Sequence, residues 1–151
     1  MEKTEPSTES DAAGSYLQLL LYRVPKKNHD AIVQNLKQSV PWFDKHEVRT
    51  EYFQLGNTET QGAVDSARQS GIQSMDSIES IAKTISGGED DEEEVWIEQQ
   101  YFRDYEHCED INAKMMQDKS FEPLLKEFFG LLTQRTSLII GGFMRLKQLE
   151  S

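Results

Sequence analysis

Residues 16–24, YLQLLLYRV, are apolar on both faces when they are read as a β-strand. Aromatic and aliphatic residues occupy odd and even positions alike, and Pro25 ends the run. A strand with one solvated face alternates between apolar and polar residues, whereas this pattern is typical of a strand that is covered on both sides. The sequence therefore predicts a sheet with two buried faces.

The rest of the chain alternates between helix and strand patterns. Asn28 is expected to cap a helix that Pro41 kinks or ends near its last turn. Asp104 is expected to cap a later helix, with Cys108, Ile111, Met115 and Met116 on one side. In chain order we predict a tail (1–15), strand (16–24), helix (from 28), strand (48–55), helical insert (about 60–88, helix 69–85), acidic solvated connector (89–94), strand (95–102), helix (after 104), short helix (120–132) and strand (137–146).

This order predicts one α+β domain over residues 16–151, after a disordered acidic tail over residues 1–15. The fold class is a ferredoxin-like βαββαβ unit with a four-stranded antiparallel sheet, helices on one face and an extra inserted helix. Leu17 and Leu19 alternate with Tyr16 and Leu20, so the uncovered face of the sheet is also apolar. A second copy packed on that face would bury it, which predicts a homodimeric α/β barrel.

The composition narrows the function. The net charge of -11 disfavours nucleic acid as a partner. The apolar runs are shorter than the roughly 20 residues that span a bilayer, and the first residues lack the order of a signal peptide. We therefore expect a soluble cytoplasmic protein that does not act at a membrane. His29, His46 and His107 lack metal-ligand spacing, and Cys108 is the only cysteine, so no metal or cofactor is predicted.

Three motifs resemble one known family. They are Tyr16 with VPKKN at residues 24–28, HCEDINAKMMQD at residues 107–118 and GGF at residues 141–143. Together they resemble the YbaA-like bacterial proteins of the dimeric α/β barrel superfamily. The resemblance implies a ferredoxin-like homodimer without an established activity. The chain departs from that family at Gln18, where the family has an acid, and in the insert, where the family has a proline-containing loop, so no catalytic acid is carried over at residue 18.

Polar side chains gather on one face of two predicted strands. We predict a ligand site on the sheet face that looks into the barrel, made by Tyr16, Gln18 and Tyr22 with Trp96, Glu98 and Gln100. The alternative is that these side chains pack in the dimer core. Asn112 completes the predicted ligand-binding set, and His107 and Glu98 are candidate acids or bases. For His107 the alternative is a half-exposed histidine that bonds a carboxylate, and Cys108 is expected to be buried and inert.

Two further charged segments are candidate ion sites. The acidic run at residues 89–94 could bind a cation, but it lacks the spaced Asp/Asn/Gly pattern of a calcium loop, and a solvated connector is the prediction. Lys26 and Lys27 beside Asn28 could hold an anion at a helix start, although a surface turn is the alternative.

The predicted function is the binding of a small molecule between sheet and helices. One alternative is a cofactor-independent oxygenase or isomerase that acts on an aromatic or quinone-like substrate. The other is a protein-interaction role for the helix at residues 69–85.

Overall fold

The computed structural model is an α+β fold with one four-stranded antiparallel sheet. The structure describes residues 15–56, 61–72, 92–133 and 138–146. The strands are β1 (Tyr16–Pro25), β2 (Arg49–Gln54), β3 (Glu93–Phe102) and β4 (Ile139–Met144), and the helices are α2 (His29–Lys45), α3 (Gln61–Gln69), α5 (Tyr105–Gln117) and α6 (Glu122–Leu131), with a 3₁₀ turn η1 (Lys26–Asn28) before α2. The strands predicted at residues 16–24, 48–55, 95–102 and 137–146 are confirmed.

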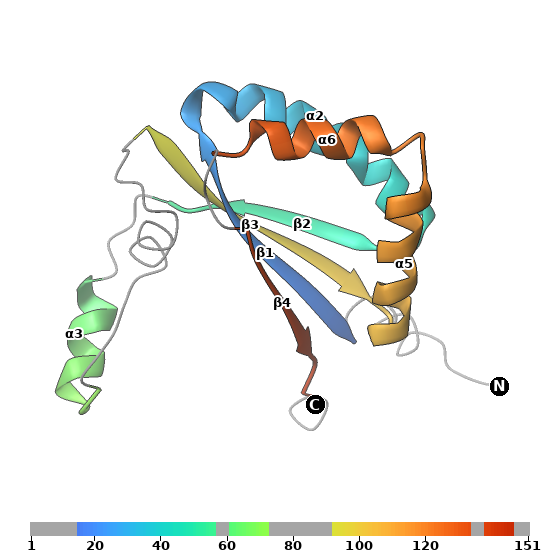
Figure 1. The fold of residues 1–151 in the computed structure, drawn as a ribbon. Helices are drawn as coiled ribbons and strands as arrows, with labels where there is room; N and C mark the ends of the chain where they lie inside the picture. The colour runs from blue at the N-terminus through green and yellow to red at the C-terminus, as the bar shows by residue number, and fades with distance from the viewer. Residues whose placement is uncertain (1–14, 57–60, 73–91, 134–137, 147–151) are drawn as a thin grey trace.

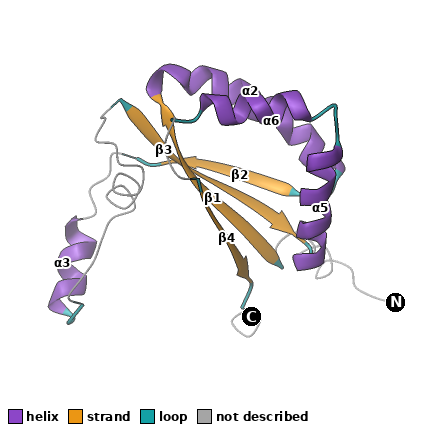
Figure 2. Ribbon diagram, in the orientation of Figure 1, coloured by secondary structure: helices purple, strands orange, loops and turns teal. Residues whose placement is uncertain are grey.

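The strands lie in the order β2-β3-β1-β4, and every neighbouring pair is antiparallel. The central strands β1 and β3 pair along their whole length, from Tyr16 opposite Phe102 to Pro25 opposite Glu93. Helices α2, α5 and α6 cover one face of this sheet, while α3 stands apart from them (Figure 1, Figure 2). Each strand-helix-strand unit therefore places its two strands on either side of a third strand.

The core lies between the sheet and these helices. Even-numbered residues of β1 and β3 point toward the helices, so Leu20, Tyr22 and Trp96 pack against Ile32 of α2 and Phe128 of α6. Burying each such aliphatic or aromatic side chain contributes about 1.5–3 kcal/mol. A second cluster lies at the other end of the sheet, where Phe43, Val48, Phe102, Cys108, Ile111 and Phe121 are buried together.

The predicted helix starts are confirmed, with changes in detail. Asn28 occupies the N-cap position of α2, but its side-chain amide donates to the Leu131 carbonyl oxygen at 3.0 Å instead of capping the helix. Asp104 caps α5 as predicted, since its Oδ1 accepts from the His107 backbone N–H at 2.8 Å. Pro41 does not end α2, which continues to Lys45.

The predicted start of the insert helix is wrong. The observed helix, α3, lies earlier and ends at Gln69. Gly71 has a φ of 102°, the Gly71 N–H donates to the Arg68 carbonyl, and the Ile72 N–H donates to the Ala67 carbonyl. This pair of bonds around a left-handed glycine terminates a helix. Residues 73–85 of the predicted helix, and residues 1–14 of the predicted tail, lie outside the described residues.

Two predictions about surface residues are also wrong. Met116 is 78% exposed and does not share the buried side of α5. The acids at the end of the run 89–94 are not a solvated connector, because Glu93 and Glu94 belong to β3. Glu93 forms a buried ion pair with Arg23. Glu94 accepts from Trp96 Nε1 at 2.9 Å and bonds His29 Nδ1 at 2.9 Å, which raises the pKa of His29.

Candidate functional site

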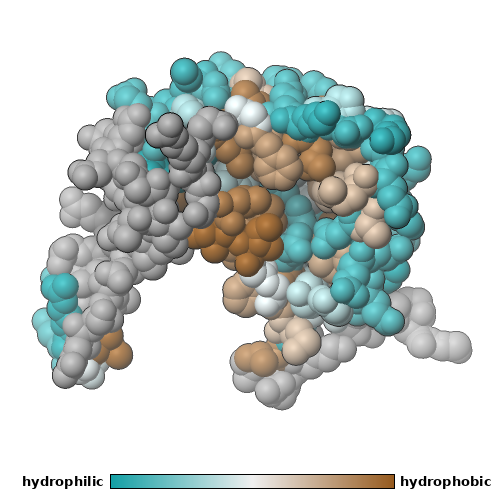
Figure 3. All heavy atoms as spheres, in the orientation of Figure 1, coloured by the Kyte–Doolittle hydropathy of each residue, from teal (hydrophilic) through white to brown (hydrophobic). Residues whose placement is uncertain are grey.

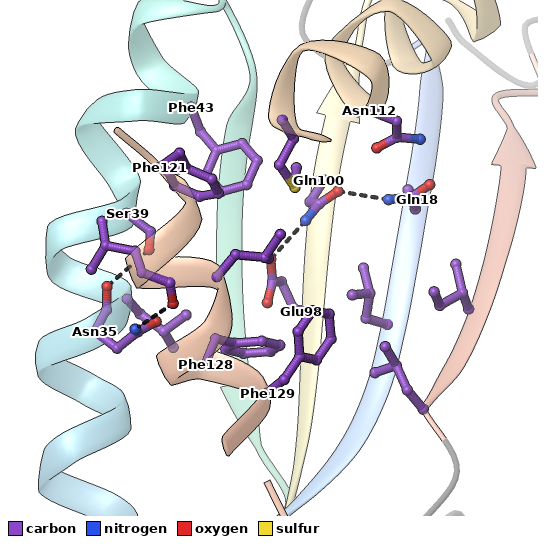
Figure 4. Close-up of a pocket in the computed structure, with 17 residues that line it drawn as sticks. Gln18, Asn35, Ser39, Phe43, Glu98, Gln100, Asn112, Phe121, Phe128 and Phe129 are labelled. Atoms are coloured by element: carbon purple, nitrogen blue, oxygen red, sulfur yellow. Dashed lines mark hydrogen bonds between the residues drawn. The ribbon is translucent and has the colours of Figure 1, made fainter. Parts of the chain in front are cut away.

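A cavity of about 170 Å³ lies between the sheet and the helices, with side chains from β1, β3, α2, α5 and α6 and from residues 138 and 140 around it (Figure 4). Its apolar lining is Leu20, Leu36, Phe43, Met115, Phe121, Leu124, Leu125, Phe128, Phe129, Leu138 and Ile140, and its polar lining is Gln18, Asn35, Ser39, Glu98, Gln100 and Asn112. An engineered apolar cavity of about 150 Å³ binds benzene. The space therefore matches one six-membered ring with a small substituent.

The cavity reaches the surface beside α6. Phe129 is 48% exposed and Ile140 is 56% exposed, and both line the cavity. Hydrophobic surface gathers in the hollow beneath α6 and along the start of β4 (Figure 3). The described lining is therefore exposed to solvent at one side chain of α6 and one of β4.

Local structure at the α5–α6 junction shapes the helical wall. Asp118 ends α5, and its Oδ1 accepts from the backbone N–H and the hydroxyl of Ser120. Its Oδ2 accepts from Trp42 Nε1 of α2 at 2.8 Å, and these bonds lower the pKa of Asp118 to about 2. The turn between α5 and α6 is thereby bonded to α2. Phe121 also stacks on Trp42 of α2, with ring centres 4.6 Å apart. This arrangement sets the direction of α6, which supplies Phe128 and Phe129.

A directional chain of hydrogen bonds crosses the sheet side of the cavity. The Asn112 amide donates to Cys108 Sγ, and the Cys108 thiol donates to Gln18 Oε1. Gln18 Nε2 donates to Gln100 Oε1 at 2.8 Å, and Gln100 Nε2 donates to Glu98 Oε2 at 2.7 Å. Gln18 and Gln100 are directly opposed across β1 and β3, which explains their contact. Each of these four bonds is donated in the direction of the Glu98 carboxyl.

Glu98 is the acidic centre of the cavity. It is 4% exposed, and burial raises its pKa, although the bonds donated by Gln100 and by the Tyr22 hydroxyl at 3.1 Å oppose that rise. Burial and the nearby Glu98 charge also raise the pKa of Tyr22 and of Tyr52, which pairs with Glu98 across β2 and β3. Among the described residues that line the cavity, none is a lysine, arginine or histidine.

Asn35 supplies a second polar group from α2, on the side of the cavity opposite Glu98 and Gln100 (Figure 4). Its Nδ2 donates to the Leu124 carbonyl oxygen at 2.9 Å and to Glu127 Oε1 at 2.8 Å, which ties α2 to α6. These two acceptors fix the orientation of the amide. Its Oδ1 is buried without a hydrogen-bond partner in a residue that is 1% exposed. A buried acceptor of this kind is unfavourable unless a ligand or water donates to it.

The structure brings together part of the predicted ligand set. The predicted residues that line the cavity are Gln18, Glu98, Gln100 and Asn112. Tyr16, Tyr22 and Trp96 do not line it. Tyr22 supports the site through its bond to Glu98 and packs near Trp96 in the core, with ring centres 6.5 Å apart. Tyr16 lies edge-on to Tyr105 at the other end of the sheet, with ring centres 5.5 Å apart. All of the predicted sheet residues lie on the helix-covered face and not on the open one.

His107 is held by the backbone and does not line the cavity. Its Nδ1 accepts from the Arg103 backbone N–H at 3.1 Å, so the ring proton lies on Nε2, which donates to the His46 carbonyl oxygen at 3.0 Å. The residue is 5% exposed, which replaces the expectation of a half-exposed histidine bonded to a carboxylate. Both ring nitrogens are occupied, so this arrangement does not favour an acid or base role. Cys108 is 3% exposed, and burial raises its pKa.

Apart from Asn112, the residues on the helical side of the cavity are not among the predicted site residues. Asn35 and Ser39 of α2 are buried and line it, as do the phenylalanines of α6. A signal for Asn35 and Ser39 exists in the sequence, since both lie on the same helical face as the apolar Ile32, Leu36 and Phe43. Polar residues on an apolar stripe point to a buried polar contact or a ligand. Lys26 and Lys27, considered as an anion site, are both exposed in η1.

No protein-family model and no curated protein matches the sequence. Within the described ranges, no group of three or more His, Cys, Asp and Glu side chains is placed to hold a metal ion. None of the helices in the described part of the chain is long and apolar enough to cross a membrane.

Proposed function

We propose that this chain is a small-molecule-binding protein whose ligand is a compact, ring-sized compound held between the sheet and the helices. The observation that carries this proposal is the cavity of about 170 Å³, which combines an aromatic wall with a few polar groups. Small-molecule sites in proteins have this composition, since apolar walls supply affinity and placed polar groups supply orientation. The unpartnered Oδ1 of Asn35 and the buried Glu98 are the orienting groups.

The same proposal includes a ferredoxin-like fold that pairs into a dimeric α/β barrel. The strand order β2-β3-β1-β4 with two split strand-helix-strand units supports that fold, as does the resemblance to the YbaA-like proteins. The open face of the sheet presents the apolar side chains of Leu17, Leu19 and Ile97, which supports its burial against a second copy. Sedimentation equilibrium is expected to give a dimer, and Leu19→Lys a monomer. A monomeric wild-type protein would contradict the pairing.

A thermal-shift titration with toluene and benzyl alcohol tests ligand binding. A compound that binds only the folded state raises the melting temperature with its concentration. We expect both compounds to stabilise the wild-type protein, and Ser39→Leu, which places a larger side chain into the cavity, to lose the response. Gln38→Leu is the matched control because Gln38 lies beside Ser39 on α2 and is exposed. Absence of a shift with either compound in the wild-type protein would contradict the proposal.

A second candidate function is cofactor-independent isomerisation, and Glu98 favours it. A carboxyl whose pKa is raised by burial is suited to take a proton from a carbon beside a carbonyl and return it elsewhere on the same substrate. The test is the incorporation of deuterium from D₂O into 2-cyclohexenone, followed by NMR. Incorporation that depends on the protein and is lost in Glu98→Gln would support an isomerase, and incorporation equal to that in buffer would leave ligand binding as the function.

A further inference from the structure

The cavity offers hydrogen-bond acceptors on two sides, at Glu98 and at Asn35. On the sheet side, the chain from Asn112 through Gln18 and Gln100 ends at Glu98, whose two oxygens already receive Gln100 Nε2 and the Tyr22 hydroxyl. Each described bond of that hydrogen-bond chain is donated in the direction of the carboxyl. On the α2 side, both described bonds of the Asn35 side chain use its amide nitrogen, and Oδ1 has none. A ligand that complements these groups carries donors.

The carboxyl of Glu98 has no counter-ion among the described residues that line the cavity. Glu98 is the only ionisable side chain in the described lining. An ionised carboxylate that is taken out of water without a partner is strongly unfavourable, and a bound cation relieves that cost. An anionic ligand would instead be repelled. The net charge of -11 over the chain favours the approach of a cation and opposes that of an anion.

The aromatic wall is compatible with the same ligand. Phe43, Phe121, Phe128 and Phe129 line the cavity around the polar groups. Phenylalanine faces attract ammonium groups, and the rings also pack against an apolar body. Acceptors, one uncompensated carboxyl and phenylalanine rings are thus placed in one space.

We infer that the cavity selects a protonated amine carried on a ring-sized apolar body, with Glu98 as its counter-ion and Asn35 Oδ1 as a second acceptor. This inference rests on the proposed function, because it names the ligand class of the same cavity. The inference adds that Glu98 recognises the charge of the ligand, whereas the cavity volume limits only the size of the ligand. Hydrogen bonds to charged groups are about twice as strong as neutral ones, so an amine is expected to bind about tenfold more tightly than an alcohol of the same shape.

The test is isothermal titration calorimetry of the full-length protein with benzylamine, benzyl alcohol and benzoate near neutral pH. These probes share one ring and differ in the charge of the substituent. We expect the affinity to fall from benzylamine to benzyl alcohol, with no binding of benzoate. Benzyl alcohol that binds as tightly as benzylamine, or more tightly, overturns the inference while ligand binding stands. If neither compound binds, both the inference and the proposed function fail.

The Glu98→Gln variant separates charge recognition from shape. The variant is expected to lose the preference for benzylamine over benzyl alcohol, and a cooperative thermal melt reports that it is folded. Glu106→Gln, which removes one exposed carboxylate from α5, is the matched control and is expected to keep that preference. A preference for benzylamine that survives in Glu98→Gln would overturn the role of Glu98. If Glu98→Gln does not fold, the three-probe series with the wild-type protein decides the inference alone.

Discussion

Replacing Ser39 with leucine should stabilise the protein while abolishing ligand binding. Ser39 is 5% exposed and lines the cavity, and its hydroxyl donates to the Asn35 carbonyl oxygen at 2.9 Å. Leucine adds three carbons, which contribute about 2.4 kcal/mol if all are buried at about 0.8 kcal/mol each. Ordering the leucine costs about 0.5–1 kcal/mol, and losing the hydroxyl bond about 0.5 kcal/mol. The net gain in the free energy of unfolding is about 1 kcal/mol.

Urea unfolding and thermal melts of the wild-type protein, Ser39→Leu and Gln38→Leu measure this gain. For a chain of this length, about 1 kcal/mol corresponds to a rise of roughly 2–4 °C in melting temperature. Gln38→Leu should change neither stability nor binding, since its side chain is exposed. A leucine forced into a filled core typically costs about 1–3 kcal/mol. A loss of that size in Ser39→Leu would refute the reasoning, because the space assigned to the ligand would then not exist.

Three further predictions concern individual side chains. Burial raises the pKa of Glu98 in the folded protein above its unfolded value of 4.5. Between these two pKa values the unfolded chain loses a proton that the folded protein keeps, so the free energy of unfolding falls as the pH rises from 4.5 to the folded pKa. Glu98→Gln should flatten this fall in urea unfolding measured at pH values above 4.5. The pKa of Asp118 is lowered from 3.8 to about 2, so its stabilisation is present above 3.8 and is lost as pH falls toward 2. Asp118→Asn should weaken the acid-induced change in circular dichroism below 3.8. Asp104→Ala should lower the free energy of unfolding, measured with urea, by about 1 kcal/mol, because the N-cap of α5 is lost. Asp104→Ser should keep most of the wild-type stability, because serine also caps helices.

Short-range sequence patterns predict most of the helices and strands of the fold. The doubly apolar β1, the cap Asp104 and the apolar spacing of α2 are short-range signals, and they predict the elements that the structure contains. Where local rules failed, a tertiary contact or a turn competed with them. Asn28 bonds the Leu131 carbonyl instead of its own helix, and Gly71 ends α3 where the apolar spacing predicts a beginning.

The candidate site was predictable mainly from the strands, and from the helices only at Asn112. Period-two alternation places Gln18, Glu98 and Gln100 on one face, and they do lie together. Alternation does not show which face of the sheet the helices cover. The sequence predicts these residues on the face that looks into the barrel, whereas they lie on the helix-covered face. Asn35 reaches the cavity only because α6 packs on α2, a contact between residues about ninety positions apart in the sequence. The apolar face of α2 marks Asn35 as a buried polar residue, but no local pattern shows its bonds to α6 or that its Oδ1 lacks a partner.

The most direct test of the proposed binding site is a methyl NMR titration of the full-length protein with benzyl alcohol. The largest shift changes should appear at Met115, Leu20 and Ile140, which line the cavity. Leu19 and Ile97, on the opposite face of the sheet, should change little. Shift changes that saturate at the cavity residues support a ligand held between the sheet and the helices. Shift changes centred on Leu19 and Ile97, or no shift changes at all, would contradict this binding site.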